Sequence, residues 1–424
     1  MALLEIRNLK IYFEVIKGKV RAVDDVSFTL DKGETMGLVG ESGCGKTTTA
    51  FTVMRLLPYN AEITGGYIIF NNKMVAWGSL ALEVSQILED AEEKEDKEWQ
   101  GKVAEAMRKR EAVLQELKDR IPQELQEDDR ETLSGLTELL KQGGEPDDIM
   151  FNLQKYLYGQ LKGFSGKRRT KKRERMMEED VRHIRWAEVS MIFQSAMNAL
   201  NPVHRIGDQI IEALVTHQDI SKEDAKKRAV ELFKLVGLDS NRVDGYPHEF
   251  SGGMRQRAMI AMALACNPQF IIADEPTTAL DVIMQDRILA EIRDIQKKLG
   301  IAMLIITHDI SVVAEVAEKI GIMYAGKLVE HGDIKDIFAR PAHPYTMGLM
   351  EAFPSIKGAR KKLRAIPGSP PNLVTPPSGC RFHPRCRFAT ERCMQEVPPM
   401  IAVASEHFSA CIFANELYSG KMGD

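Results

Sequence analysis

The sequence lacks any apolar run of the roughly 18–20 residues that a membrane-spanning helix needs. Its longest apolar stretches, at residues 258–266 and 301–306, are short and suit buried elements. Glu5 interrupts the apolar stretch that a signal peptide would need near the N-terminus, so we expect no export. These absences predict a cytoplasmic protein whose contact with a membrane, if any, is peripheral.

Cysteine is scarce and neither sign of charge dominates. Six cysteines in 424 residues argue against the disulfide framework of a small secreted protein. A net charge of −4 argues against a basic face for nucleic acid, so we expect no nucleic-acid partner. The 44% of hydrophobic residues are enough to build a core, and the length predicts two or three domains.

Composition divides the chain into four parts. Residues 1–80 and 186–335 carry the strand and helix patterns of an α/β domain. Residues 81–185 have roughly twice the charge density of the rest, which predicts an inserted helical hairpin. Its basic run, residues 167–175, is either a solvated surface or a contact for lipid headgroups or a partner protein. Residues 336–424 are rich in proline and predict a separate, loop-rich C-terminal module.

A glycine-rich segment follows the expected strand Thr35–Val39 and precedes an expected helix at residues 47–57. It fits the phosphate-binding pattern G-x-x-x-x-G-K-[ST] at every position. Backbone N–H groups of such a loop surround a β-phosphate, the lysine binds the β and γ oxygens, and the threonine hydroxyl ligates Mg²⁺. We therefore predict that ATP is bound by Gly40, Glu41, Ser42, Gly43, Cys44, Gly45, Lys46, Thr47 and Thr48.

Two consecutive carboxylates end the buried strand expected at residues 270–273. Asp274, at the strand tip, is placed to hold Mg²⁺, and Glu275 is placed to act as the general base for an attacking water. Because they follow a phosphate-binding loop in the same chain, we interpret this pair as catalytic rather than as a loop cap.

A third segment, residues 250–257, precedes a helix of small and apolar residues. Ser251 can cap that helix, and two glycines allow a phosphate to approach its N-terminus closely. The predicted phosphate contacts here are Ser251, Gly252, Gly253 and Met254. If this loop and the phosphate-binding loop lie on distant lobes, a nucleotide held between two subunits would engage both.

Together these motifs resemble the ATP-binding cassette (ABC) family over the whole chain except the insertion. The resemblance implies an α/β fold: a P-loop (RecA-like) core with an antiparallel β subdomain and an α-helical signature subdomain. It implies that Gln194 senses Mg²⁺, which is held by Thr47, Gln194 and Asp274, and that His308 contacts the γ-phosphate. It further implies that Asp281 lies in the D-loop and that Phe13, with Tyr12 as the alternative, stacks on adenine.

Three further segments resemble oligopeptide and dipeptide importer ATPases: residues 195–210, 341–349 and 366–411. This resemblance implies a protein peripheral to the cytoplasmic face of the cell membrane. The implied partners are two membrane-embedded permeases, a second cassette (a paralogue or another copy of this chain) and, indirectly, an extracytoplasmic solute-binding protein. The solute is then a peptide or a related small solute such as an oligosaccharide or a nickel complex. The alternative is a soluble ABC-type ATPase of DNA repair or chromosome metabolism with a metal-binding tail.

Four cysteines, Cys380, Cys386, Cys393 and Cys411, lie in the last tenth of the chain with the spacing C-x5-C-x6-C-x17-C. Short zinc knuckles use closer pairs, so zinc is the poorer fit. Some relatives with this tail carry a [4Fe–4S] cluster on these cysteines, and the resemblance implies one here. We expect nearby arginines to offset the charge of the four thiolates: Arg381, Arg385, Arg387 and Arg392.

Overall fold

The computed structural model describes residues 2–71, 73–77, 184–194, 199–278, 281–352 and 365–421. The chain divides into one unit of residues 1–77 and 177–424 and a second unit of residues 78–176. The second unit, and with it the expected helical insertion and its basic run, lies outside the described residues. Ile184 and Arg185, the last two residues of the expected insertion, belong to the core of the first unit. Ile184 is buried there, and Arg185 donates to the carbonyls of Met54 and Arg55.

An antiparallel sheet of four strands has the order β2-β1-β4-β5. Its strands are β1 (Ala2–Val15), β2 (Gly18–Asp31), β4 (Ala61–Phe70) and β5 (Lys73–Trp77). The sequence pattern suggests shorter strands within residues 3–30, whereas β1 and β2 run through as two long strands with register shifts. One shift follows Ile6, where Asn8 has a left-handed backbone with a φ of 45°. Such a bulge bends a strand without ending it.

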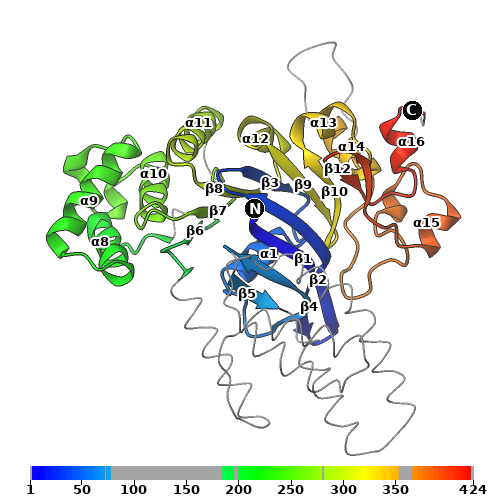
Figure 1. The fold of residues 1–424 in the computed structure, drawn as a ribbon, viewed down its shortest axis with the longest axis horizontal. Helices are drawn as coiled ribbons and strands as arrows, with labels where there is room; N and C mark the ends of the chain where they lie inside the picture. Colours follow the sequence, from blue (N-terminus) through cyan, green and yellow to red (C-terminus); the bar gives the residue numbers. More distant parts are fainter. Residues whose placement is uncertain are drawn as a thin grey trace, which may run out of the picture. The chain divides into compact units, whose positions relative to one another are not determined.

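The second sheet has eight strands in the order β11-β12-β10-β9-β3-β8-β7-β6 (Figure 1). Five neighbouring strands are parallel: β6 (Val189–Ile192), β7 (Phe270–Asp274), β8 (Ala302–Thr307), β3 (Thr35–Val39) and β9 (Lys319–Tyr324). Every residue of β3, β6, β7 and β8 is buried, which explains their nearly continuous apolar sequences. Parallel strands place their carboxyl ends at one edge of the sheet, where loops carry polar groups.

Helices flank this sheet. They are α1 (Lys46–Val53), α8 (Ile206–His217), α9 (Lys222–Leu235), α10 (Gly252–Ala263), α11 (Val282–Leu299), α12 (Ile310–Val316), α13 (Ile334–Ala339), α14 (Pro344–Ala352), α15 (Glu391–Gln395) and α16 (Ala414–Tyr418). Helices α8, α9 and α10 form the expected helical subdomain (Figure 1).

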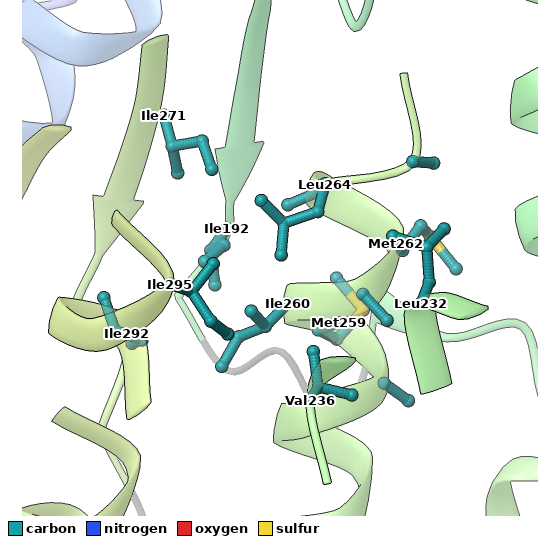
Figure 2. Close-up of a cluster of buried hydrophobic side chains, with 14 of the residues drawn as sticks. Ile192, Leu232, Val236, Met259, Ile260, Met262, Leu264, Ile271, Ile292 and Ile295 are labelled. Carbon is teal, nitrogen blue, oxygen red and sulfur yellow. The ribbon is translucent and has the colours of Figure 1, made fainter. Parts of the chain in front are cut away.

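Helix α10 joins that subdomain to the sheet. Figure 2 shows Met259 and Ile260 of α10 among Leu232 of α9, Ile192 of β6 and Ile295 of α11. Burying such a side chain fully contributes about 1.5–3 kcal/mol. The cluster therefore fixes the start of α10 relative to the strands.

The C-terminal region continues the sheet and is not a separate module. Strand β10 (Lys327–Asp333) pairs antiparallel with β9 and with β12 (His407–Ser409), and β12 pairs with β11 (Ile401–Ala404). Without β12, β10 would be an edge strand with unpaired backbone groups. The pairing with β12 gives those groups hydrogen-bond partners. Proline content correctly predicts loops here but gives no sign of this pairing. Within the described residues, no helix combines the length and the apolar character that crossing a membrane requires.

Candidate functional site

The loop between β3 and α1 requires glycine at two positions. A Cβ atom on Gly40 would lie 2.1 Å from the carbonyl oxygen of Met323, and one on Gly45 would lie 2.2 Å from that of Ala22. Gly45 precedes α1 in a left-handed conformation with a φ of 102°. Ser42 and Gly43 are exposed on the loop. The backbone is thus held close to β2 and β9, with the N-terminus of α1 at its end, as an anion-binding loop requires.

Lys46 lies along this loop with only 6% of its surface exposed. Its Nζ donates to the carbonyl oxygens of Gly40 at 2.7 Å and Glu41 at 3.0 Å, and it lies 3.6 Å from the Sγ of Cys44. Burial raises the pKa of the Cys44 thiol, so Cys44 is a neutral filler of the loop. The lysine bonds to neutral carbonyls, so these contacts leave its charge available to phosphate oxygens.

Asp274 at the tip of β7 is 1% exposed. Its Oδ1 accepts a hydrogen bond from the Thr47 hydroxyl at 3.2 Å, while its buried Oδ2 has no partner within the described residues. Burial, together with the neighbouring Glu275 charge, raises the pKa of Asp274. A buried carboxylate oxygen without a donor, beside a hydroxyl, is a set that fits a hard divalent cation such as Mg²⁺.

Glu275 is where three of the predicted residues meet. Its Oε2 accepts from Gln194 Nε2 at 2.8 Å and from the Thr278 hydroxyl at 2.9 Å, and its Oε1 lies 3.0 Å from His308 Nδ1. Burial favours the protonated carboxyl, but these hydrogen bonds outweigh it and lower the pKa of Glu275. The side chain is therefore an ionised carboxylate held by partners that follow β6, β7 and β8.

Sequence reasoning misses Thr278. The sequence does carry a signal for this residue. A hydroxyl side chain three residues after an acid in a turn can reach back and donate to the carboxylate.

The other predicted residues occupy separate places. Ser251 caps α10, where its hydroxyl accepts from the Met254 amide at 3.4 Å, so the segment Ser251–Met254 starts a helix of the helical subdomain. Asp281 caps α11 by accepting from the Met284 amide at 2.9 Å, and residues 279 and 280 of the expected D-loop lie outside the described residues. On β1, Phe13 is half-buried against the core.

Tyr12, the alternative to Phe13 for adenine stacking, is already engaged. Its hydroxyl donates to Asp24 Oδ1 at 3.2 Å, and the Arg21 guanidinium lies 5.9 Å from its ring centre. Phe13 therefore stays our prediction for the adenine contact.

Cys380, Cys386, Cys393 and Cys411 line one pocket with apolar side chains that include Phe382, Phe388 and Phe413. The Phe413 amide donates to the Cys411 Sγ at 3.4 Å. Burial raises the pKa of Cys386 to about 11 and of Cys411 to about 12, so both are thiols without a cation. Among the described residues, no group of three or more His, Cys, Asp or Glu side chains is arranged to hold a metal ion.

The four arginines that we expected to offset thiolate charge have carboxylate partners, which the sequence analysis does not predict. Each pairs with a carboxylate: Arg381 with Asp24, Arg385 with Glu41, Arg387 with Glu351 and Arg392 with Glu396. Carboxylates bind the planar guanidinium in two-point contacts that thiolates do not offer. Three of these acids are distant in sequence, so spacing alone gives no hint of them.

The strand–loop–helix unit, the buried acid and the converging glutamine and histidine define an ATPase of the ABC class. Residues 23–138 and 152–278 match the family model described as ABC transporter, and residues 329–393 match that of the oligopeptide/dipeptide transporter C-terminal region.

Relatives match over nearly the whole chain. The oligopeptide transport ATP-binding protein OppD of Bacillus subtilis is 37% identical over 96% of this chain and 87% of its own length. The dipeptide transport ATP-binding protein DppD of the same organism is 36% identical over 96% and 93%. OppD of Salmonella typhimurium is 34% identical over 96% and 93%. The chain belongs to the ABC transporter family, in the branch of these peptide-transport ATP-binding proteins, and it is an ATPase. These matches support a transporter and not the alternative of a soluble DNA-repair ATPase.

Proposed function

We propose that this chain is the ATP-hydrolysing subunit of an importer that takes up dipeptides or oligopeptides. The observation that carries the proposal is the match of its C-terminal region, residues 329–393, to the oligopeptide/dipeptide transporter model. The near full-length relatives, named for oligopeptide and dipeptide transport, support it. A related small solute, such as an oligosaccharide or a nickel complex, is the second candidate, because the resemblance to this branch implies those solutes too.

In the proposed mechanism, Lys46 and the loop amides bind the phosphates of ATP. Thr47, Asp274 and Gln194 would hold Mg²⁺, which supplies charge neutralisation at the phosphate oxygens. Gln194 then leaves its present partner Glu275. Glu275 accepts a proton from the water that attacks the γ-phosphorus, and the bond from that phosphorus to ADP breaks. His308 orients Glu275 and contacts the γ-phosphate.

The proposed assembly has two cassettes. Ser251, Gly252, Gly253 and Met254 of one cassette face the nucleotide on the other, and the second cassette is a paralogue or another copy of this chain. Two membrane-embedded permeases bind the pair at the cytoplasmic face of the membrane, and an extracytoplasmic binding protein delivers the solute.

The test is uptake by proteoliposomes that contain this chain, its permeases and the second cassette. We expect labelled peptide to accumulate only with ATP and the binding protein. Uptake of nickel or an oligosaccharide with no response to any peptide would refute the peptide assignment while leaving the ATPase intact.

We further infer that the four tail cysteines hold a [4Fe–4S] cluster. The shared pocket, its apolar lining and the amide donor to Cys411 support this inference, since such clusters use four thiolates with hydrogen-bonded sulfurs.

Anaerobically purified protein should be brown and contain about four irons per chain. Cys393→Ser should lose both the colour and the iron, whereas Cys266→Ser, a buried cysteine outside the pocket, should keep them. Stoichiometric zinc without iron would contradict the cluster and indicate a zinc module.

A further inference from the structure

We propose that Arg385 and Tyr345, both from the C-terminal region, are positioning residues for the phosphate-binding loop and act through Glu41. The inference goes beyond peptide uptake, since it concerns ATP binding by the chain itself. Its test therefore does not depend on which solute is transported.

The first contact is a two-point ion pair. Arg385 Nη1 lies 2.8 Å from Glu41 Oε2, and Arg385 Nη2 lies 3.0 Å from Glu41 Oε1. The arginine side chain is only 7% exposed. Its Nε donates to the Pro367 carbonyl at 2.7 Å, and its Nη1 also donates to the Tyr324 hydroxyl at 3.3 Å. The guanidinium is thus fixed by groups other than Glu41, so it can hold the loop in place.

The second contact comes from Tyr345. Its hydroxyl accepts a hydrogen bond from the Glu41 amide at 3.0 Å. Its ring is buried against Tyr324 and Phe382, with centroid separations of 4.7 and 5.3 Å.

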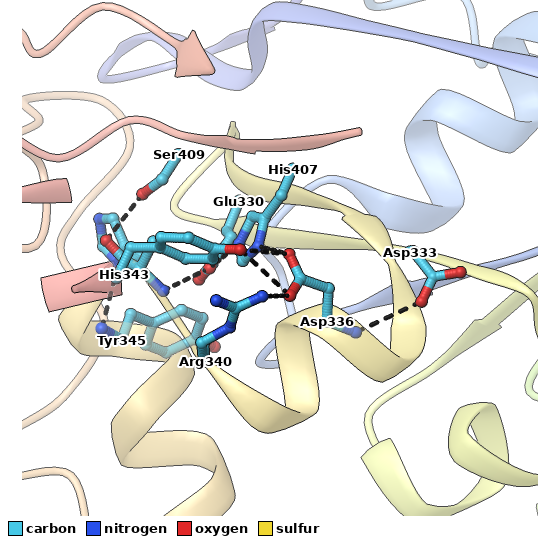
Figure 3. A network of polar contacts seen from close by, with 10 residues as sticks. Glu330, Asp333, Asp336, Arg340, His343, Tyr345, His407 and Ser409 are labelled. Carbon is cyan, nitrogen blue, oxygen red and sulfur yellow. Dashed lines mark hydrogen bonds and ion pairs between the residues drawn. The ribbon is translucent and has the colours of Figure 1, made fainter. Parts of the chain in front are cut away.

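The backbone around Tyr345 is held by the polar network in Figure 3. The Tyr345 amide donates to His343 Nδ1 at 3.0 Å, and Ser409 of β12 donates to the Ala342 carbonyl at 2.9 Å. The Ala342 amide donates to the buried Glu330 at 2.6 Å. The tail strand β12 and the start of α14, which carries Tyr345, are therefore connected through these hydrogen bonds.

Glu41 joins these contacts to the catalytic lysine. Its carboxylate binds Arg385, its amide binds Tyr345, and its carbonyl accepts from Lys46 Nζ at 3.0 Å. Without Arg385, the Glu41 carboxylate would be an uncompensated negative charge on a loop that must bind a triphosphate. Like charges repel more strongly where water is partly excluded than in bulk water. Arg385 therefore supports ATP affinity by neutralising Glu41 and by fixing the peptide on which Lys46 rests.

The test compares full-length Arg385→Met, Glu41→Gln and the double variant by equilibrium titration of ATP and by steady-state hydrolysis. We expect Arg385→Met to weaken ATP binding about tenfold and to raise KM with kcat nearly unchanged. The double variant should recover most of that affinity, because no carboxylate is then left unpaired. Tyr345→Phe, which removes only the acceptor of the Glu41 amide, should weaken binding less.

Arg387→Met is the matched control. Arg387 follows Cys386 in the chain and makes a two-point pair with Glu351 that is more exposed than the Arg385 pair and lies away from the phosphate-binding loop residue Glu41, so its loss should leave ATP affinity unchanged. A purely structural role for Arg385 predicts lower thermal stability with wild-type ATP affinity, and that result would overturn the proposal. So would a double variant as weak as Arg385→Met. If Arg385→Met does not fold, Arg385→Lys should show an intermediate loss of affinity, and wild-type affinity in that variant would count against the proposal.

Discussion

Asp274 and Glu330 are both buried carboxylates on strands of the same sheet, and each has one oxygen without a partner among the described residues, but the partners of the other oxygen differ. Asp274 has a threonine hydroxyl on one oxygen and no partner on the other among the described residues. Glu330 is fully buried; its Oε2 likewise has no partner among the described residues, but its Oε1 accepts from the Ala342 amide at 2.6 Å and from His407 Nε2 at 2.7 Å. The other nitrogen of that ring lies 2.8 Å from Asp336 Oδ2 (Figure 3).

The difference separates a site that needs a ligand from one that holds the fold together. A buried carboxylate costs free energy unless a cation or donors compensate it. At β10 the compensating cation is the chain's own His407, whereas at β7 we propose that it is Mg²⁺ bound with ATP. The cluster of Glu330, His407 and Asp336 also connects β12 to the segment before α14, the helix that carries Tyr345, so this structural cluster supports the proposed nucleotide site.

The largest effect should come from breaking the cluster that Glu330, His407 and Asp336 form. His407→Gln leaves Glu330 buried without its cation, and removing one partner of a buried pair costs about 3–5 kcal/mol. Urea unfolding of the full chain should show this loss in the free energy of unfolding. Arg392→Gln is the control: it breaks an exposed pair with Glu396 and should cost at most about 1 kcal/mol. Equal losses in the two variants would show that the cluster is not compensating a buried charge.

The same cluster predicts a pH dependence. Burial alone would lower the pKa of His407, but its hydrogen bonds to Glu330 and Asp336 raise it above the ordinary 6.5. The stability that His407 contributes is therefore fully present below pH 6.5 and is lost as the pH rises through the raised pKa. Unfolding measured between pH 6 and 9 should show this decline in the wild type and a shallower one in His407→Gln.

At the nucleotide site, Lys46→Ala should weaken ATP binding about 10–100-fold, because a charge-assisted hydrogen bond contributes about 1.5–3 kcal/mol. Folding should be affected little, since Lys46 donates only to the loop's own carbonyls. Equilibrium titration of ATP and thermal unfolding measure the two effects. If Lys46→Ala strongly lowered the free energy of unfolding but left ATP binding intact, Lys46 would be a structural residue and not a nucleotide contact.

A smaller effect distinguishes the two aromatic side chains on β1. Phe13→Leu keeps an apolar contact but loses the stacking, so ATP binding should weaken about fivefold, which is the lower end of the roughly 1–3 kcal/mol that stacking on a base is worth. Tyr12→Phe keeps the ring and removes only the hydrogen bond to Asp24, so ATP affinity should be nearly unchanged. The opposite order in a titration would assign the adenine contact to Tyr12.

The nucleotide motifs could be predicted from sequence because each depends on a few neighbouring residues. Gly40 and Gly45 are required by backbone approach, Lys46 and Thr47 follow at fixed spacing, and Asp274 ends a buried strand. The resemblance to the ABC family supplied Gln194 and His308, which follow strands that the sheet places near β7.

The tail could not be predicted in the same way. The contact between Arg385 and Glu41 joins residues 344 positions apart, and the pairing of β12 with β10 depends on an edge strand that no local pattern reveals. The carboxylate partners of the arginines near the cysteines were therefore not predicted. A charged side chain in a loop pairs with whatever acid the fold brings to it, and that requires the tertiary structure.

The most direct test of the account is steady-state hydrolysis and ATP binding by Glu275→Gln in the full chain. Glutamine keeps the size of the side chain but cannot accept the proton of the attacking water. We expect turnover to fall about 10²–10⁴-fold while ATP binding persists and a nucleotide-bound dimer accumulates on size-exclusion chromatography. Wild-type turnover in this variant would contradict the account, because it would remove Glu275 as the base on which Gln194, Thr278 and His308 converge.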